Sequence, residues 1–279
     1  MTIINFTKMQ GLGNDFVILD YEEYEKTKAE MPVLARKLCD RHFGIGADGL
    51  IIINKNVSDA DIGWFFYNSD GTVAQMCGNG IRCFAKYVSS YIKKAEFSVD
   101  TKAGIIIPKI NADGLVTVNM NKPVLTPSLI PLNSPNNLNF NITANDVVFK
   151  ANAISMGNPH CVIFTEKDTK EFALKYGAEI ENNPIFPEKT NVEFIKILSR
   201  DEINLDVWER GCGITLACGT GACASVVAGI LNNLLNKKVK VNLPGGVLYI
   251  EWDGSLNNTD KNVYMTGPAE FSFTGQIDL

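Results

Sequence analysis

Short β-patterned runs of apolar residues dominate the hydrophobic pattern of this chain. Turn-forming residues separate most of these runs, which is typical of strands joined by turns. We therefore predict a fold rich in β-sheet. The runs expected to form strands are residues 3–6, 15–19, 50–53, 62–67, 97–107, 115–120, 147–154, 192–198, 205–208 and 247–252.

Two segments, residues 81–94 and 222–235, have a helical pattern instead. The second carries Ala, Val, Ile and Leu on nearly every side of its first turns, which predicts a helix that is buried all round. A helix enclosed by strands is the simplest arrangement that buries it.

The stretch of residues 123–141 is rich in Pro, Asn and Ser, and we interpret it as a connection between two units. The length of 279 residues, with 46% hydrophobic content, also favours two domains. We place the boundary near Asn119. This gives an N-terminal domain of residues 1–118 and a C-terminal domain of residues 119–264.

A weak internal repeat indicates that the two halves are similar. Residues 77–80 read Cys-Gly-Asn-Gly, residues 218–221 read Cys-Gly-Thr-Gly, and a helical run follows each. A polar residue, Asn68 or Glu209, stands nine residues before each cysteine. We expect an α+β fold of two β-rich domains related by pseudo-twofold symmetry, each a curved sheet or barrel enclosing a central helix. Such packing would bring the two cysteines face to face.

A cysteine followed by Gly-x-Gly and a helical run lies at a helix N-terminus. Free backbone N–H groups and the helix macrodipole favour negative charge there, so we expect the thiolates of Cys77 and Cys218 to be stabilised. The glycines let the backbone approach a ligand closely, and the free N–H groups can hold a carboxylate.

Two thiols at such positions suit stereoinversion of an amino acid. One group removes the α-proton from one face, and the other returns a proton from the opposite face. Backbone N–H groups would stabilise the charge that develops on the carboxylate, so no electron-sink cofactor is required. The sequence therefore predicts a cofactor-independent racemase or epimerase with Cys77 and Cys218 as its acid–base pair.

Composition narrows the partners and the compartment. The formal net charge of −5, with no dense Lys and Arg cluster, argues against nucleic acid. No apolar run is long enough to cross a bilayer and no secretion signal is recognisable, so we expect a cytoplasmic protein without membrane contact. Seven cysteines are an odd number, which disfavours a disulfide framework. Cys83 and Cys223 are interpreted as core residues, and Cys39, Cys161 and Cys212 receive no role.

The motifs taken together resemble those of the diaminopimelate epimerase family over essentially the whole chain. The matching segments are residues 8–16, 68–71, 76–83, 155–160, 208–211, 217–222 and 265–269. The resemblance implies interconversion of LL- and meso-diaminopimelate in lysine and peptidoglycan-precursor synthesis, without pyridoxal phosphate or metal. It also implies that residues 265–279 return to complete the first domain. The partner is then a small amino-acid substrate, and a homodimer is the candidate assembly.

Carried over motif by motif, the family's acid–base pair falls on Cys77 and Cys218, and His160 and Glu209 match positions that tune the two thiols. Asparagine both donates and accepts hydrogen bonds, Arg210 suits a bidentate grip on a carboxylate, and Glu209 can meet an ammonium. The implied substrate contacts are Asn14, Asn68, Gly78, Asn79, Asn158, Asn191, Glu209, Arg210, Gly219 and Thr220. His42 is interpreted as structural.

Two positions depart from the family pattern. Many relatives have a substrate-contacting Gln where this chain has Gly49, so that contact is absent or supplied differently. Relatives commonly have an acidic residue where this chain has Ile214. This second change could alter the order of its loop or the range of substrates.

Two other interpretations remain open. A proline racemase-like or hydroxyproline epimerase-like enzyme would use the same two-cysteine chemistry, but the polar set around Asn158 and Arg210 argues for a longer, doubly charged substrate. A zinc or redox protein could be built on Cys77, Cys83, Cys218 and Cys223. The spacings within each segment are not the compact ones usual for structural zinc, which argues against this.

Overall fold

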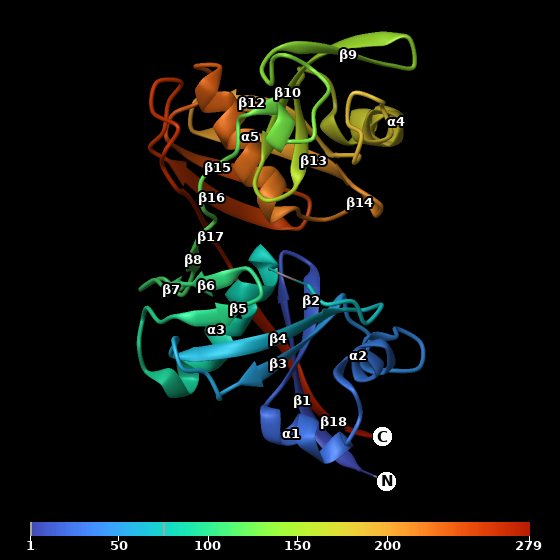
Figure 1. Cartoon of the computed structure of the whole chain (residues 1–279), viewed down its shortest axis with the longest axis vertical. Coiled ribbons are helices and arrows are strands. Elements are labelled where there is room, and N and C mark those ends of the chain that lie inside the picture. The colour runs from blue at the N-terminus through green and yellow to red at the C-terminus, as the bar shows by residue number, and fades with distance from the viewer. Residues whose placement is uncertain (1, 75) are drawn as a thin grey trace. The chain divides into compact units, whose positions relative to one another are not determined.

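The computed structural model describes residues 2–74 and 76–279. The chain folds into two compact units, whose elements are labelled in Figure 1. Unit 1 comprises the chain up to Val118 together with Gly267–Leu279, and unit 2 comprises Asn119–Thr266. The last segment of the chain therefore belongs to the same unit as the first.

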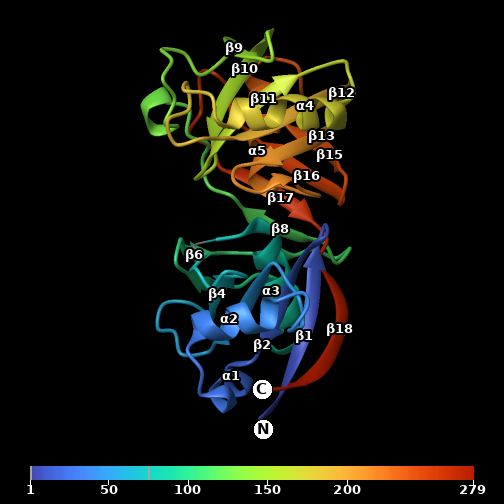
Figure 2. The ribbon, with the colours of Figure 1, turned by 90° about the vertical axis from the view of Figure 1, so that its right-hand side faces the viewer.

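The strands of the unit 1 sheet are β1 (Ile3–Gly11), β2 (Asn14–Leu19), β3 (Gly49–Asn54), β4 (Ile62–Asn68), β5 (Val99–Thr101), β6 (Gly104–Ile106) and β18 (Glu270–Asp278). Their order is β18-β1-β2-β3-β4-β5-β6. Strands β1 and β18 pair antiparallel, with Ile3 opposite Asp278, and the two termini lie close together in unit 1 (Figures 1 and 2). Two short strands, β7 (Lys109–Ile110) and β8 (Val116–Asn119), form a further antiparallel pair.

Three helices cover the two faces of this sheet: α1 (Tyr21–Thr27), α2 (Met31–Cys39) and α3 (Gly78–Ile92). Successive side chains of a strand point to opposite faces. Phe65 of β4 packs into the core formed with α2, whereas the neighbouring ring of Trp64 lies 5.5 Å from that of Phe84 on α3. Helices α1 and α2 therefore lie on one face and α3 on the other.

The strands of unit 2 are β9 (Phe140–Ala144), β10 (Val147–Ser155), β11 (Pro159–Phe164), β12 (Asn191–Ser199), β13 (Glu202–Glu209), β14 (Gly213–Ile214), β15 (Lys238–Leu243), β16 (Gly246–Trp252) and β17 (Val263–Gly267). Their order is β17-β16-β15-β13-β12-β11-β10-β9, and β14 pairs with β13. Helix α4 (Thr169–Glu181) packs on β9, β12 and β13, and its Ala173, Tyr176 and Ile180 belong to a large apolar core.

Helix α5 (Gly219–Leu231) contacts β10, β11, β12 and β16, which are distributed across most of this sheet. The sheet must therefore curve around the helix, as expected for a sheet that encloses a central helix. The prediction of a helix buried all round is confirmed, because residues 221–229 are all buried. The strand orders of the described residues are open at both ends, so the alternative of a closed barrel is wrong.

Three α-helices of the described residues, α1, α2 and α4, were not predicted. The carboxylate of Asp168 caps α4 by accepting a hydrogen bond from the Glu171 N–H (2.8 Å), an Asp-x-x-Glu start signal that is readable in the sequence. Helices α1 and α2 are short, with 7 and 9 residues, which leaves little room for a helical period to show.

Two other expectations also differ from the structure. The predicted strand of residues 97–107 is two strands, β5 and β6, because Gly104 adopts a positive φ of 97° at the turn between them. The stretch of residues 123–141 is more than a connection. Its Ile130, Leu132 and Phe140 are buried in the core of unit 2, so its Pro and Asn residues shape a packed segment.

Close approach of α4 to β13 depends on Gly177. A Cβ at this position would lie 2.5 Å from Trp208 Cβ, which is closer than side-chain carbons pack. In an exposed helix, Gly→Ala stabilises by about 1 kcal/mol. Here Gly177→Ala is expected to lower the free energy of unfolding by about 1–3 kcal/mol, because the added methyl group overpacks the interface.

Urea unfolding followed by tryptophan fluorescence measures this change. Ala178→Gly, at the exposed neighbouring position, is the control and should lose only helix propensity, about 1 kcal/mol. Stability that is unchanged or increased in Gly177→Ala would show that the helix and the strand have room to separate.

Candidate active site

Each unit starts its central helix with a cysteine cap. Cys77 is the N-cap of α3 and Cys218 is the N-cap of α5, and both have extended backbone dihedral angles. Each sulfur accepts a hydrogen bond from the N–H of the second glycine, Gly80 or Gly221, at 3.4 Å. The prediction that both Cys-Gly-x-Gly segments begin a helix is confirmed. The first-turn N–H groups at these two positions can bind an anionic group of a ligand.

Asparagine side chains surround Cys77 in unit 1. The Cys77 sulfur lies 3.6 Å from Asn14 Oδ1, and Asn79 Nδ2 donates to the same oxygen at 3.4 Å. Arg82, which has no exposed surface, donates to Asn79 Oδ1 at 2.8 Å and to the Gly78 carbonyl at 3.0 Å. Because a guanidinium can only donate, it fixes the orientation of the Asn79 amide.

A charged network holds Asn14 from the other side. Asn14 Nδ2 donates to Asp48 (2.7 Å), and Arg41 forms ion pairs with both Asp48 (2.7 Å) and Asp15 (2.9 Å). Lys8 completes the network with an ion pair to Asp15 at 2.8 Å. Burial alone would raise the pKa of Asp15, but hydrogen bonds from Arg41 and Lys8 outweigh it and lower the pKa to about 2.

Acidic groups and a histidine surround Cys218 in unit 2. One ligand-type atom each of Cys218, His160 and Glu193 lies within 4.8 Å of the others, and all three residues are buried. Burial is the main cause that raises the pKa of Cys218 well above its usual value, and Glu209 and Glu193 add to it. The expectation of a stabilised thiolate is therefore wrong for Cys218 in this arrangement, because burial beside carboxylates outweighs the helix N-terminus.

Glu209 is tied to the same cluster. Burial is the main cause that raises the pKa of its carboxyl, and a hydrogen bond from the Thr215 hydroxyl opposes the shift. The Cys218 sulfur also lies 3.5 Å from the hydroxyl of Thr220, in the first turn of α5. His160, Glu209 and Thr220 are thus grouped around one cysteine, and Gly219 begins the helix beside it.

The remaining predicted residues fall into two sets. Asn158 Oδ1 lies 3.0 Å from His160 Nε2, which joins it to the Cys218 cluster. The Asn191 side chain accepts a hydrogen bond from the Arg210 backbone N–H at 3.0 Å and donates one to the carbonyl of Pro159 at 2.8 Å. Pro159 directly precedes His160 in the sequence.

The other set lies at exposed positions. The guanidinium of Arg210 is exposed and donates to the carbonyl of Glu188 at 3.0 Å. Asn68 is exposed at the last position of β4, where its amide donates to Thr72 at 3.0 Å. The hydrogen bonds found for these two side chains therefore do not lead to either cysteine.

Sequence reasoning missed Glu193, Arg82 and Asp48. Glu193 and Arg82 are fully buried charges within otherwise apolar segments, and that pattern was the available signal. Nothing in the sequence around Asp48 indicates its contact with Asn14, which depends on the fold of the loop that follows α2.

The structure shows what surrounds the two positions that depart from the family pattern, Gly49 and Ile214. A Cβ at Gly49 would lie 2.7 Å from the Phe66 ring, so this position of β3 has no room for a longer side chain. Ile214 pairs with Trp208 across β13 and β14 and packs against the apolar core of unit 2. An apolar residue at position 214 therefore contributes to packing.

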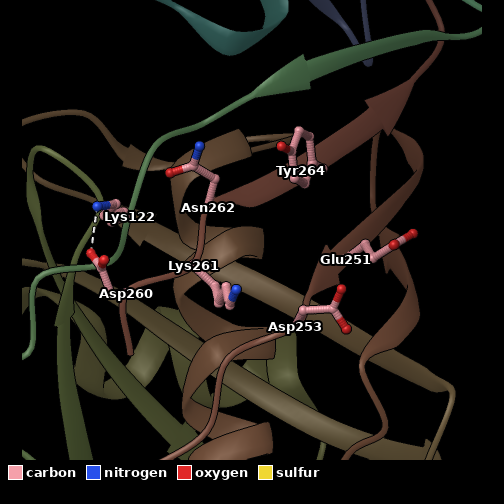
Figure 3. Close-up of a pocket in the computed structure, with 7 residues that line it drawn as sticks. All are labelled: Lys122, Glu251, Asp253, Asp260, Lys261, Asn262 and Tyr264. Atoms are coloured by element: carbon pink, nitrogen blue, oxygen red, sulfur yellow. Dashed lines mark ion pairs between the residues drawn. The ribbon is translucent and has the colours of Figure 1, made fainter. Parts of the chain in front are cut away.

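A groove of about 310 Å³ in unit 2 contains none of the predicted site residues. Figure 3 shows its lining side chains and the ion pair between Lys122 and Asp260. The lining residues are Lys122, Glu251, Asp253, Asp260, Lys261, Asn262 and Tyr264. Its lining has mixed charges and includes no residue of either cysteine cluster, so we take those clusters as the candidate active site.

Metal binding was the third possibility. Within residues 2–74 and 76–279, the group with suitable ligand types and spacing is His160, Glu193 and Cys218. Of the four cysteines of the zinc alternative this group contains Cys218 alone, and Cys83 and Cys223 are fully buried within their helices.

Within residues 2–74 and 76–279, no helix is long and apolar enough to cross a membrane.

Solved structures with the same two-unit architecture define the class of fold. A phenazine biosynthesis protein of the PhzF family from Bacillus anthracis matches with a TM-score of 0.71 at 14% identity, covering 100% of both chains. A hydroxyproline epimerase from Agrobacterium vitis matches with a TM-score of 0.67 at 11% identity, covering 99% of this chain and 94% of that one. The fold is therefore one that epimerases share with the phenazine biosynthesis proteins.

Sequence comparison identifies the family within this class. The sequence model for diaminopimelate epimerase matches residues 6–126 and again residues 152–272, which confirms the internal repeat. The diaminopimelate epimerase of Halothermothrix orenii is 49% identical over 98% of both chains. This chain belongs to the diaminopimelate epimerase family, and it is an isomerase.

The network around Asp15 generates a pH-dependent prediction. The pKa of Asp15 is lower in the folded state, so its charged form stabilises the fold above pH ~4, and this contribution is lost as the pH falls through about 2. Asp15→Asn should lower the free energy of unfolding by on the order of 2 kcal/mol at pH 6. The difference from the wild type should shrink between pH 4 and pH 2.

Urea unfolding at pH 6, 4 and 2.5 tests this dependence. Asp59→Asn, at an exposed position of unit 1, is the matched control and should show no such trend. An Asp15→Asn effect that stays constant with pH would mean that the carboxylate contributes hydrogen bonds but no ion pairing.

Proposed function

We propose that this protein interconverts LL- and meso-diaminopimelate, using Cys77 and Cys218 as a thiolate and thiol pair. The observation that supports this most directly is the cysteine cap at the start of the central helix in each half of a diaminopimelate epimerase family member. The reaction would serve the synthesis of lysine and of peptidoglycan precursors.

The mechanism requires the two sulfurs to act on opposite faces of one α-carbon. One thiolate takes the α-proton, and the electron pair left on carbon delocalises into the neighbouring carboxylate. The other thiol then delivers its proton to the opposite face, which inverts the configuration and exchanges the protonation states of the two sulfurs. In the reverse direction the two groups exchange roles.

Stabilisation of the intermediate would come from the helix starts. N–H groups of the first helical turns, at Gly78 and Asn79 in one unit and at Gly219 and Thr220 in the other, would donate to the substrate carboxylate. Such preorganised donors are often the largest catalytic contribution, and the reaction then needs no electron-sink cofactor.

Recognition of the substrate would use groups that match its two ammonium and two carboxylate ends. We propose that Arg210 binds a carboxylate, and that Glu209 accepts from an ammonium as well as tuning Cys218 together with His160. The asparagines supply donors and acceptors without net charge. They are Asn14, Asn68, Asn79, Asn158 and Asn191.

We also propose a cytoplasmic location. Seven cysteines are an odd number, which disfavours a disulfide framework and suits a reducing compartment. A thiolate and thiol mechanism needs the same condition, because oxidation of either sulfur removes a proton carrier.

We propose in addition that two copies assemble through the edge of the unit 1 sheet. Strand β18 ends the strand order, and nearly all of its residues are exposed. Its Phe271 and Phe273 are about half exposed, at 52% and 51%. An exposed edge strand with aromatic side chains is a ready site for pairing with a second copy.

Loss of either thiol tests the reaction. Cys77→Ser and Cys218→Ser should each reduce epimerisation of LL-diaminopimelate by about 10²–10⁴-fold, because a hydroxyl is a poor acid–base group at neutral pH. NMR in deuterium oxide follows both α-proton exchange and the meso product. Cys212→Ser, at an exposed cysteine without an assigned role, is the control and should retain activity.

The two variants also test the assignment of the pair. Full activity in either one would refute the two-base mechanism. Proline is the control substrate, and turnover of proline in place of diaminopimelate would favour a proline racemase-like enzyme.

The assembly is tested by sedimentation velocity. Phe271→Asp should convert a dimer to a monomer, because it places a charge on the exposed edge strand. Phe43→Asp, at a loop residue that is 91% exposed, is the matched control and should leave the dimer intact. A wild-type monomer, or a dimer that survives Phe271→Asp, would contradict pairing through β18.

A further inference from the structure

A fully buried carboxylate, Glu193, lies beside Cys218 and has no part in the mechanism as derived above. It lies on β12 with no exposed surface, and its Oε1 is 2.6 Å from Nδ1 of His160, which is also fully buried. Within the part of the chain that the structure describes, its other oxygen, Oε2, has no hydrogen-bond partner. Such a carboxylate destabilises the fold relative to a neutral side chain of the same shape. We therefore expect the buried carboxylate of Glu193 to have a chemical role.

The start of α5 is shaped around this carboxylate and the thiol together. A Cβ at Gly221 would lie 2.6 Å from Glu193 Oε1 and 3.2 Å from Cys218 Sγ. Only glycine leaves room for both groups at this point of the helix. The second glycine of the motif thus lets a carboxylate approach a cysteine cap.

The equivalent position in unit 1 has different neighbours. A Cβ at Gly80 would lie 3.4 Å from Cys77 Cβ and 3.5 Å from the ring of Phe16. Both are ordinary van der Waals distances to carbon atoms. The repeat therefore conserves the geometry of the helix start, but it places an aromatic ring beside the second glycine of one motif and a carboxylate beside that of the other.

The ionisable groups around Cys218 come from three strands. His160 and the buried Cys161 lie on β11, Glu193 lies on β12, and Glu209 lies on β13. A thiolate at Cys218 would be repelled by both carboxylates. The imidazole of His160 is the one group of this set that could pair with a thiolate as a cation, and its Nδ1 is already engaged by Glu193.

We propose that Glu193 is a positioning residue that keeps Cys218 in the thiol form in the resting enzyme. It acts through its negative charge and by holding His160 away from a thiolate–imidazolium pair. The role of that thiol as proton donor rests on the proposed epimerase reaction. The protonation state of Cys218 does not, so it can be tested without substrate.

The test is the pH dependence of Cys218 alkylation by iodoacetamide, resolved from the other cysteines by mass spectrometry. Glu193→Gln removes the charge and nearly preserves the shape, so alkylation of Cys218 at pH 7 should be about tenfold faster, a shift of roughly one pH unit. Glu193→Asp retains a carboxylate and should stay closer to the wild type. Glu181→Gln, at a buried carboxylate on α4, is the matched control and should leave the profile unchanged.

Comparing the alkylation profiles of Glu193→Gln and Glu193→Asp separates an effect of the charge of Glu193 from an effect of its packing. If Glu193 only filled space, the shorter aspartate would perturb Cys218 more than the isosteric glutamine, which would overturn the proposal. A profile that Glu193→Gln leaves unmoved, or moves to higher pH, would overturn it as well. Should Glu193→Gln fail to fold, the wild type remains decisive, since a Cys218 that is alkylated as a thiolate at pH 7 contradicts a resting thiol.

Epimerisation gives a second, separate readout. Glu193→Gln should lower kcat more than it changes KM, and the pH profile of kcat should move in the same direction as the alkylation profile. A shifted alkylation profile without any epimerase activity in the wild type would support the role of Glu193 and refute the proposed reaction.

Discussion

The first turn of a helix leaves backbone N–H groups without partners inside the helix. In both units of this protein, a cysteine sulfur accepts a hydrogen bond from one of these N–H groups. The cap fixes the cysteine sulfur at the N-terminal end of a helix that is largely buried, so the packing of the sheet around the helix sets the position of the thiol. The glycine three residues later is part of the same constraint, since its N–H reaches the sulfur. Changes elsewhere in either unit therefore affect the chemistry by moving the helix.

Around this shared geometry the two units have different charges. The thiol of unit 1 lies among amides whose orientation is fixed by a buried arginine on one side and by an aspartate on the other. The thiol of unit 2 lies among carboxylates and a histidine, and it is buried more deeply. The two similar units thus give their thiols unequal surroundings. Unequal surroundings suit a reaction that needs one acid and one base at each moment.

The two helix starts and the two-unit fold could be predicted, because their signals lie within short segments of the sequence. The Cys-Gly-x-Gly segments and the apolar helix of residues 222–235 carry their own signals, and the repeat extended them to a two-unit fold. The contacts that tune the site are not local. Glu193 reaches His160 because β11 and β12 pair in parallel, and Asp48 reaches Asn14 across a loop that no periodicity predicts. The raised pKa of Cys218 depends on burial, which a helix-start argument omits.

The last segment of the chain, Gly267–Leu279, belongs to unit 1, and this determines the order in which the two units can fold during synthesis. Unit 2 is continuous in sequence and is complete once residue 266 has left the ribosome, whereas the first sheet still lacks β18. Arg82, which orients the Asn79 amide, also donates to the carbonyl of Pro268. This hydrogen bond cannot form until the last segment of the chain has been synthesised. A nascent chain can therefore complete the surroundings of Cys218 before those of Cys77, and a prematurely terminated product holds only Cys218 in its native setting.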